Sequence, residues 1–410
     1  MNVLIFLNLY LISTIDICWG WWYSDVTITI EKEITVTGKE YSTPSRKKYG
    51  AFMGIPYAEP PKDKRRFKPP EMKEIAESLR ADKLGSECVQ ETSSEDITGD
   101  EDCLFLNVYV PWPQKKEKLP VMFWVHGGSF NKGNGGWQYY GPDYLIEQDV
   151  IVVTINYRLG ILGFLSAPEI GIHGNMGLKD QREALKWVNK YIDKFGGDKD
   201  RITIFGESAG AGSIHYLMMD STTDKLYTRA ILQSGSALNP WAYQFQPKER
   251  FENFTKALTL EGGAAADLSK LQSLTVDQIM EAAKKVPDSE DERRANKPVF
   301  NPVIEKDDFT DDPIVTQDIL DLMQTKNKFP DKEVLMGFNS AEGLLAMDRV
   351  IKDKDEIKNT LKDVERVIPR DFQVWLDPNN EKVKTAIENL MKTYNNDKEE
   401  ITIKMKSKIL

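Results

Sequence analysis

The sequence predicts an α/β fold in which a central, mostly parallel sheet is flanked by helices. Helical stretches lie between some of its strand-like segments, and this alternation is typical of a sheet covered on both faces. Five short apolar runs are typical of buried parallel strands. They are VMFWV at 121–125, VIVVTI at 150–155, RITIF at 201–205, RAIL at 229–232 and EVLMG at 333–337.

The clearest predicted helix is DQREALKWVNKYIDKFGG, which begins at Asp180. We expect Asp180 to cap its start, with Glu183 at the third position, and Gly196 and Gly197 to end it. Its apolar positions share one stripe, formed by Leu185, Val188, Ile192 and Phe195.

Composition and charge are those of an ordinary globular protein. The chain has 410 residues, of which 40% are hydrophobic and 29% charged. The formal net charge of -10 argues against a general attraction for nucleic acid or anionic lipid. No repeat and no dividing linker is evident, so we expect a single domain over residues 21–410.

The N-terminus predicts secretion. Its apolar stretch, Val3 to Ile12, is too short to span a bilayer and suits a signal peptide over residues 1–20, cleaved after Gly20. The alternative is a buried N-terminal strand. No later segment is long and apolar enough to span a membrane, so we expect a soluble, extracellular protein. The triplet NFT makes Asn253 a candidate glycosylation site.

Cysteine usage is consistent with secretion. Cys18 lies inside the proposed signal, which leaves Cys88 and Cys103 as an even pair. In an oxidising compartment a disulfide closing this short loop is expected. The alternative is two free buried thiols, which fits a cytosolic protein.

Ser208 is the candidate nucleophile. It lies in Gly-Glu-Ser-Ala-Gly, directly after the predicted strand at 201–205. A sharp turn here would lift its Oγ above the sheet, and side chains at Gly206 and Gly210 would collide with neighbouring backbone. The N–H of Ala209 would face the same space as Oγ, as an oxyanion donor. The alternative is a glycine-rich turn with a helix-capping serine.

A second loop supplies further candidate donors. HGGSF at 126–130 follows the predicted strand at 121–125 and matches the HGGG-type loop of esterases and lipases. The amides of Gly128 and Ser129 would donate to an oxyanion alongside Ala209, each worth roughly 10²–10³ in rate. We expect His126 to position this loop and not to act as a base.

The sequence resembles the type B carboxylesterase family, which includes the cholinesterases. The resemblance rests on segments between about residues 25 and 350: FMGIPYAEPPKDKRRFKPPE at 52–71, EDCLFLNVYVP at 101–111, INYRLGILGFLS at 155–166, GNMGLKDQREALKWV at 174–188, FGESAGAGSIH at 205–215, LQSGSAL at 232–238 and GFNSAEGLL at 337–345. It implies an α/β-hydrolase fold, Ser208 as nucleophile, Glu342 as the acid of a triad and Cys88 as the partner of Cys103. No metal or cofactor is implied, because the covalent route needs neither.

The base of the triad is missing from the expected place. The family order is serine, acid, then histidine, but the only histidines are His126, His173 and His215. On a helix His215 would lie roughly 10 Å along the axis from Ser208, too far for a hydrogen bond. His173 falls in a loop that is structural in the family. We therefore expect a chain that stops short of the catalytic histidine, with hydrolysis weak or absent, since its loss costs on the order of 10⁶ in turnover.

Two departures bear on the substrate, a small-molecule carboxylic ester. The segment between Cys88 and Cys103 has no aromatic residue, which argues against a quaternary ammonium substrate. Glu207 precedes the serine. The corresponding motif of juvenile hormone esterases resembles GQSAG, with glutamine in this position, so a general carboxylesterase is favoured. The alternatives are a non-catalytic binding or adhesion protein, as neuroligin-like and neurotactin-like relatives are, and a protein that sequesters esters by slow acylation. The retained Ser208, HGGSF and Glu342 favour enzyme ancestry.

Overall fold

The computed structural model describes residues 24–92, 96–244, 246–258, 267–287, 299–305, 310, 312–324, 332–342 and 385. The predicted signal peptide at 1–20 therefore lies outside the described residues, as does the tail after residue 350 apart from Thr385. None of the helices in the described ranges has the length and apolarity needed to cross a bilayer.

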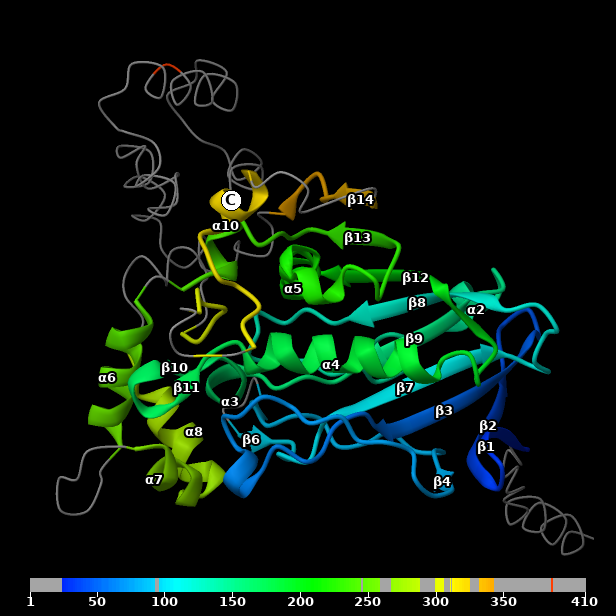
Figure 1. Cartoon of the computed structure of the whole chain (residues 1–410), viewed down its shortest axis with the longest axis horizontal. Coiled ribbons are helices and arrows are strands. Elements are labelled where there is room, and N and C mark those ends of the chain that lie inside the picture. The colour runs from blue at the N-terminus through cyan, green and yellow to red at the C-terminus, as the bar shows by residue number, and fades with distance from the viewer. Residues whose placement is uncertain are drawn as a thin grey trace, which may run out of the picture.

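The described residues form a ten-stranded mixed sheet in the order β1-β2-β3-β7-β9-β8-β12-β13-β14, with β4 beside β2 (Figure 1). From β9 to β14 the neighbouring strands are parallel, whereas β1, β2, β3, β7 and β9 pair antiparallel. Two small sheets lie apart from it, β5 with β6 and β10 with β11. The bounds are β1 Asp25–Glu31, β2 Ile34–Ser42, β3 Lys48–Pro56, β4 Leu79–Arg80, β5 Gln90–Glu91, β6 Ile97–Thr98, β7 Phe105–Pro111, β8 Leu119–Val125, β9 Ile151–Ile155, β10 Ser166–Ala167, β11 Ile172–His173, β12 Gly197–Glu207, β13 Arg229–Gln233 and β14 Glu333–Gly337.

The five segments predicted from apolar runs are confirmed as neighbouring parallel strands, β8, β9, β12, β13 and β14, but the expected burial is wrong for β14, which ends the described sheet order and has all five residues exposed. The physical reason is clearest in β9, where every residue is buried, so the strand reads as a continuous apolar run. The antiparallel strands β1 to β3 and β7 were not predicted.

Helices cover both faces of the sheet, as predicted. α4 and α5 lie on the same side (Figure 1), and α5 packs on β8, β12 and β13. On the opposite face, Ile146 of α2 packs with Tyr109 and Val152, which point away from the neighbouring core residues Val108 and Val153. The helix bounds are α2 Asp143–Ile146, α3 Gly160–Phe164, α4 Met176–Tyr191, α5 Ala209–Met219, α6 Pro247–Ala257, α7 Leu268–Ser273, α8 Val276–Lys284 and α10 Ile319–Gln324.

The predicted start and end of the long helix are wrong. α4 begins at Met176, so Asp180 lies inside the helix and does not cap it. Its carboxylate accepts hydrogen bonds from Arg158 Nε and Nη2, at 2.8 and 2.6 Å. Buried pairing with a distant residue thus outweighs the local capping preference. At the other end α4 stops at Tyr191, and the chain turns through Gly196, at φ 81°, into β12.

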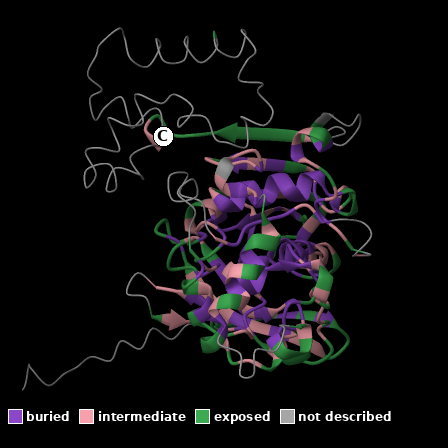
Figure 2. Cartoon of the chain, turned by 90° about the vertical axis from the view of Figure 1, so that its left-hand side faces the viewer, coloured by how far each residue is buried: buried purple, intermediate pink, exposed green. Residues whose placement is uncertain are grey.

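Burial is densest between the sheet and its helices, while all five residues of β14 are exposed (Figure 2).

The core also holds an ion pair without any solvent contact. Lys179 Nζ of α4 lies 2.6 Å from Glu305 Oε1, and both side chains are 0% exposed. Glu305 Oε2 accepts from Asn175 Nδ2 at 2.8 Å and from the amide of Ile314 at 2.9 Å. The pair therefore fastens the segment around residue 305 to the start of α4.

Removing one partner of this pair should be strongly destabilising. Lys179→Met would leave the Glu305 carboxylate buried and without its counter-charge, so we expect the free energy of unfolding in urea to fall by about 3–5 kcal/mol. Lys190→Met is the matched control, because Lys190 pairs with Glu74 on the exposed side of the same helix; it should cost less than about 1 kcal/mol. Equal, small losses in both variants would contradict the buried pairing.

Candidate active site

Ser208 sits at a sharp turn between β12 and α5. Its backbone has φ 55° and ψ −122°, a sparsely populated conformation that costs on the order of 1–3 kcal/mol for a residue with a side chain. The side chain makes no capping hydrogen bond with the first turn of α5. The alternative of a helix-capping serine is therefore wrong, and Oγ is available for another task.

Neighbouring backbones pass unusually close to this turn. A Cβ at Gly210 would lie 2.1 Å from the carbonyl oxygen of Val125, at the end of β8. A Cβ at Gly206 would lie 2.5 Å from the carbonyl carbon of Gly210. Because real Cβ atoms do not approach backbone this closely, both positions require glycine, as the sequence predicts. The turn is thus fixed by the packing of β12 and α5 against β8.

The loop after β8 lies beside Ser208. A Cβ at Gly127 would be 3.1 Å from Ser208 Cβ. Gly128, Ser129 and Phe130 follow with consecutive positive φ angles of 106°, 55° and 59°. Phe130 is buried against the ring of Phe164, with 5.2 Å between centroids, and anchors the end of the turn. Gly128 and Ser129 remain partly exposed at its apex.

The three amides predicted as oxyanion donors come from these two elements. In the described part of the chain, the N–H groups of Gly128, Ser129 and Ala209 donate to no other backbone carbonyl. Ala209 is the first residue of α5, where N–H groups have no partner within the helix. Fixed N–H groups beside a serine hydroxyl can stabilise negative charge on an oxygen that forms there.

Glu342 reaches the same edge of the sheet. Ser208 follows β12, Ser234 follows β13 and Glu342 lies a few residues after β14, where the strands end in register. Glu342 Oε1 accepts hydrogen bonds from Ser234 Oγ at 2.6 Å and from the amide of Asn339 at 2.7 Å. These two bonds, the first above all, lower the pKa of Glu342 and keep it ionised. Ser234 was not singled out from the sequence, although it lies in the quoted motif LQSGSAL.

Glu207, directly before Ser208, adds a second carboxylate. A Cβ at Gly127 would lie 2.9 Å from Glu207 Oε2, so the carboxylate rests against the loop after β8. The residue is exposed over much of its surface, yet partial burial of the carboxylate, followed by the charge of Glu342, raises its pKa. The charge of Glu342 therefore acts on the residue next to Ser208.

The structure places none of the three histidines at Ser208 Oγ. His126 is fully buried, stacks on Tyr157 and directs Nδ1 to the carbonyl oxygen of Gly127 at 2.7 Å. His215 lies within α5, where Nδ1 accepts from the amide of Ala237 at 3.2 Å. Burial lowers the pKa of each to about 4. His173 lies in β11 and pairs with Ser166.

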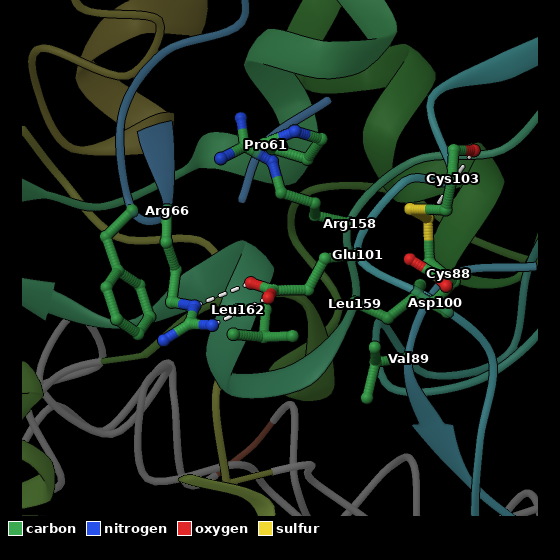
Figure 3. Close-up of a pocket in the computed structure, with 11 residues that line it drawn as sticks. Pro61, Arg66, Cys88, Val89, Asp100, Glu101, Cys103, Arg158, Leu159 and Leu162 are labelled. Atoms are coloured by element: carbon green, nitrogen blue, oxygen red, sulfur yellow. Dashed lines mark hydrogen bonds and ion pairs between the residues drawn. A yellow bond between two sulfur atoms is a disulfide. The ribbon is translucent and has the colours of Figure 1, made fainter. Parts of the chain in front are cut away.

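The remaining predicted positions are Cys88, Cys103 and Asn253. Cys88 and Cys103 form a disulfide. It borders a cavity of about 10 Å³, room for one water at most, which the Arg66–Glu101 ion pair also lines (Figure 3). Asn253 is partly exposed on α6. The described residues contain no cluster of three or more His, Cys, Asp or Glu side chains suited to a metal ion.

Comparison with known proteins agrees with this geometry. A family model described as the carboxylesterase family matches residues 24–409. The chain is 36% identical to a carboxylic ester hydrolase of Bombus ignitus over 332 residues, which are 79% of this chain and 58% of that protein. It is 37% identical to a juvenile hormone esterase of Tribolium castaneum over 339 residues, 80% of this chain and 57% of that protein. It thus spans little more than half the length of these relatives.

A solved structure has a similar fold. The juvenile hormone esterase of Manduca sexta, with OTFP covalently attached, superposes with a TM-score of 0.77 and 27% identity, and the match covers 94% of this chain and 72% of that one. The predicted fold and family are therefore confirmed: the chain has the α/β-hydrolase fold and belongs to the carboxylesterase family.

Proposed function

We propose that this protein is a carboxylic ester hydrolase that acts through an acyl-serine intermediate on Ser208. The observation that carries the proposal is the strained turn that holds an uncapped serine hydroxyl beside three amides for which the described residues offer no backbone partner. Strain of this kind persists only where the surrounding structure enforces it, and it clusters at active sites.

In the proposed reaction, Ser208 Oγ attacks the ester carbonyl carbon and loses its proton to a base. The carbonyl oxygen takes up negative charge, which the amides of Gly128, Ser129 and Ala209 stabilise. The C–O bond to the alcohol then breaks, and water releases the acyl group by the same path. Glu342 would orient an imidazole in the correct tautomer and stabilise its protonated form. Ser234 and Asn339 serve this role by keeping Glu342 ionised.

The imidazole itself is not among the histidines of this sequence. His126 and His215 are buried and engaged with backbone groups, and His173 belongs to β11. We therefore propose that these 410 residues by themselves acylate slowly, with hydroxide or water accepting the Ser208 proton. The residual catalysis expected from an oxyanion site and binding alone is roughly 10³–10⁴ over water.

The proposed substrate is a small-molecule carboxylic ester, and the proposed class is a general carboxylesterase. Two relatives carry the names carboxylic ester hydrolase and juvenile hormone esterase. Glu207 favours the first, because the motif of juvenile hormone esterases resembles GQSAG, with glutamine at this position. We also propose secretion after cleavage at Gly20, which the disulfide supports, and N-glycosylation at Asn253, which lies partly exposed on α6.

A fluorophosphonate should label Ser208 and no other residue. Attack by Oγ forms an O–P bond and expels fluoride, and the three amides would hold the phosphoryl oxygen. We expect one covalent adduct by intact mass, mapped to Ser208 by peptide sequencing, and none in Ser208→Ala. Ser213 is a matched control, because it is a buried serine within α5; Ser213→Ala should label like the wild type. Labelling that survives Ser208→Ala would exclude the proposed nucleophile.

The pH dependence of this labelling tests the identity of the base. Without a histidine base the rate should rise about tenfold per pH unit between roughly pH 7 and 9, because only the ionised hydroxyl reacts. If His126 or His215 were the base, the rate would level off above about pH 5, since the pKa of each is about 4. Added imidazole should accelerate labelling near neutral pH. Glu342→Gln should leave the rate without imidazole within about twofold and weaken the acceleration.

A further inference from the structure

The second half of the loop after β8 is held by side chains from a distant part of the chain. Gln90, in β5, makes a two-way pair with Gly133. The amide of Gly133 donates to Gln90 Oε1 at 2.8 Å, and Gln90 Nε2 donates to the carbonyl oxygen of Gly133 at 3.1 Å. Nε2 also donates to the carbonyl oxygen of Cys88 at 3.0 Å. The Gln90 carboxamide thus makes the pair of hydrogen bonds with Gly133 that the backbone of a neighbouring strand would otherwise make.

Gly133 transmits this contact to the candidate oxyanion site. It has φ 116°, and a Cβ there would lie 2.5 Å from His126 Nδ1 and 2.9 Å from the carbonyl oxygen of Gly127. His126 Nδ1 in turn lies 2.7 Å from that same carbonyl oxygen. Because a carbonyl only accepts, Nδ1 carries the proton. The contacts run without a gap from Gln90 to the peptide that precedes Gly128.

Gln90 is itself firmly placed. It is 8% exposed, follows Cys88 by two residues and pairs with Thr98 across β5 and β6. Cys88 is fixed by the disulfide to Cys103, shown in Figure 3 beside the cavity that Val89 also borders. A second bond joins the same two segments, from Asn134 Nδ2 to Glu87 Oε2 at 3.0 Å. The segment around Cys88 is therefore hydrogen-bonded to the loop after β8 at two places, Gly133 and Asn134.

We propose that Gln90 is a positioning residue for the oxyanion site: through Gly133 and His126 its carboxamide sets where the amides of Gly128 and Ser129 lie. The role requires a carboxamide, because only that group presents a donor and an acceptor side by side to one peptide. A carboxylate has the same shape but no donor, and it would face the carbonyl oxygens of Gly133 and Cys88. The kinetic part of the test rests on the proposed function; the structural part does not.

The test compares Gln90→Glu with Gln114→Glu in the full chain. Gln114 is the matched control, because its Nε2 also donates to a carbonyl oxygen, that of Lys194, on the exposed surface at 3.1 Å. Amide hydrogen exchange is followed by mass spectrometry. In Gln90→Glu we expect residues 126–136 to exchange at least about tenfold faster, with residues 197–219 unchanged. Gln114→Glu should change neither segment.

Fluorophosphonate labelling gives the second readout. We expect the maximal labelling rate of Ser208 to fall roughly tenfold in Gln90→Glu, with the half-saturating concentration within about twofold, because removing one oxyanion donor outright costs roughly 10²–10³. The defect should shrink as the pH falls through the pKa of the introduced carboxyl, which regains a donor when protonated. This pH-dependent recovery would show that the loop requires the hydrogen-bond donor and not merely the shape of the side chain. Gln90→Met, uncharged and of similar length, should reproduce the loop exchange without the recovery.

Each result decides the proposal. Unchanged exchange in residues 126–136 in both Gln90 variants would overturn it. So would equal acceleration in Gln114→Glu, or acceleration spread over the whole chain, because either points to general destabilisation. If wild-type Ser208 does not label at all, the proposed esterase function fails, while the exchange data still decide whether Gln90 positions the loop. If Gln90→Glu does not fold, Gln90→Met supplies the exchange and labelling comparisons.

Discussion

The close approach of three backbone segments at Ser208 is the constraint on which the site depends. The end of β8, the turn after β12 and the start of α5 meet with Val125, Gly206 and Gly210 in contact. The segment after β13 closes the other side, since a Cβ at Gly235 would lie 2.3 Å from the carbonyl oxygen of Ser208. Any side chain at these glycines would force the turn open. Backbone packing therefore holds the hydroxyl, and within the described ranges no side-chain cap bond does so.

The same packing brings the other groups into range. Because β8, β12, β13 and β14 are neighbouring parallel strands, their carboxyl ends lie at one edge of the sheet. Each strand is followed by one part of the site: the HGGSF loop, Ser208, Ser234 and Glu342. The loops need little structure of their own, since the sheet fixes where each begins. The HGGSF loop, with three positive φ angles in succession, is the one that needs outside support.

Much of the fold was predictable because a strand that is buried on both faces of the sheet is a continuous run of mostly apolar residues, as β9 is. The alternating burial of β1 matches an alternation of apolar and polar residues in DVTITIE, which is also a strand signal, although a shorter-range one than a continuous apolar run. Asp180 misled the prediction of the helix start because its partner, Arg158, lies 22 positions away in the sequence. A local pattern carries no information about such a pair.

The site was predictable to the extent that it is encoded in contiguous motifs. Ser208 and the HGGSF loop follow from glycine spacing after a strand, and Glu342 from resemblance alone. Ser234 and Gln90 could not be ranked from the sequence, because their roles come from partners 108 and 43 positions away. Serine and glutamine are common surface residues, so only their contacts distinguish these two.

The central claim is that an oxygen bound to Ser208 falls among amides from two separate loops. The most direct measurement is a crystal structure of the protein after reaction with a fluorophosphonate. The account predicts that the phosphoryl oxygen lies about 2.7–3.1 Å from the amide nitrogens of Ala209 and of at least one of Gly128 and Ser129. A phosphoryl oxygen turned to solvent, with those amides bonded elsewhere, would contradict it.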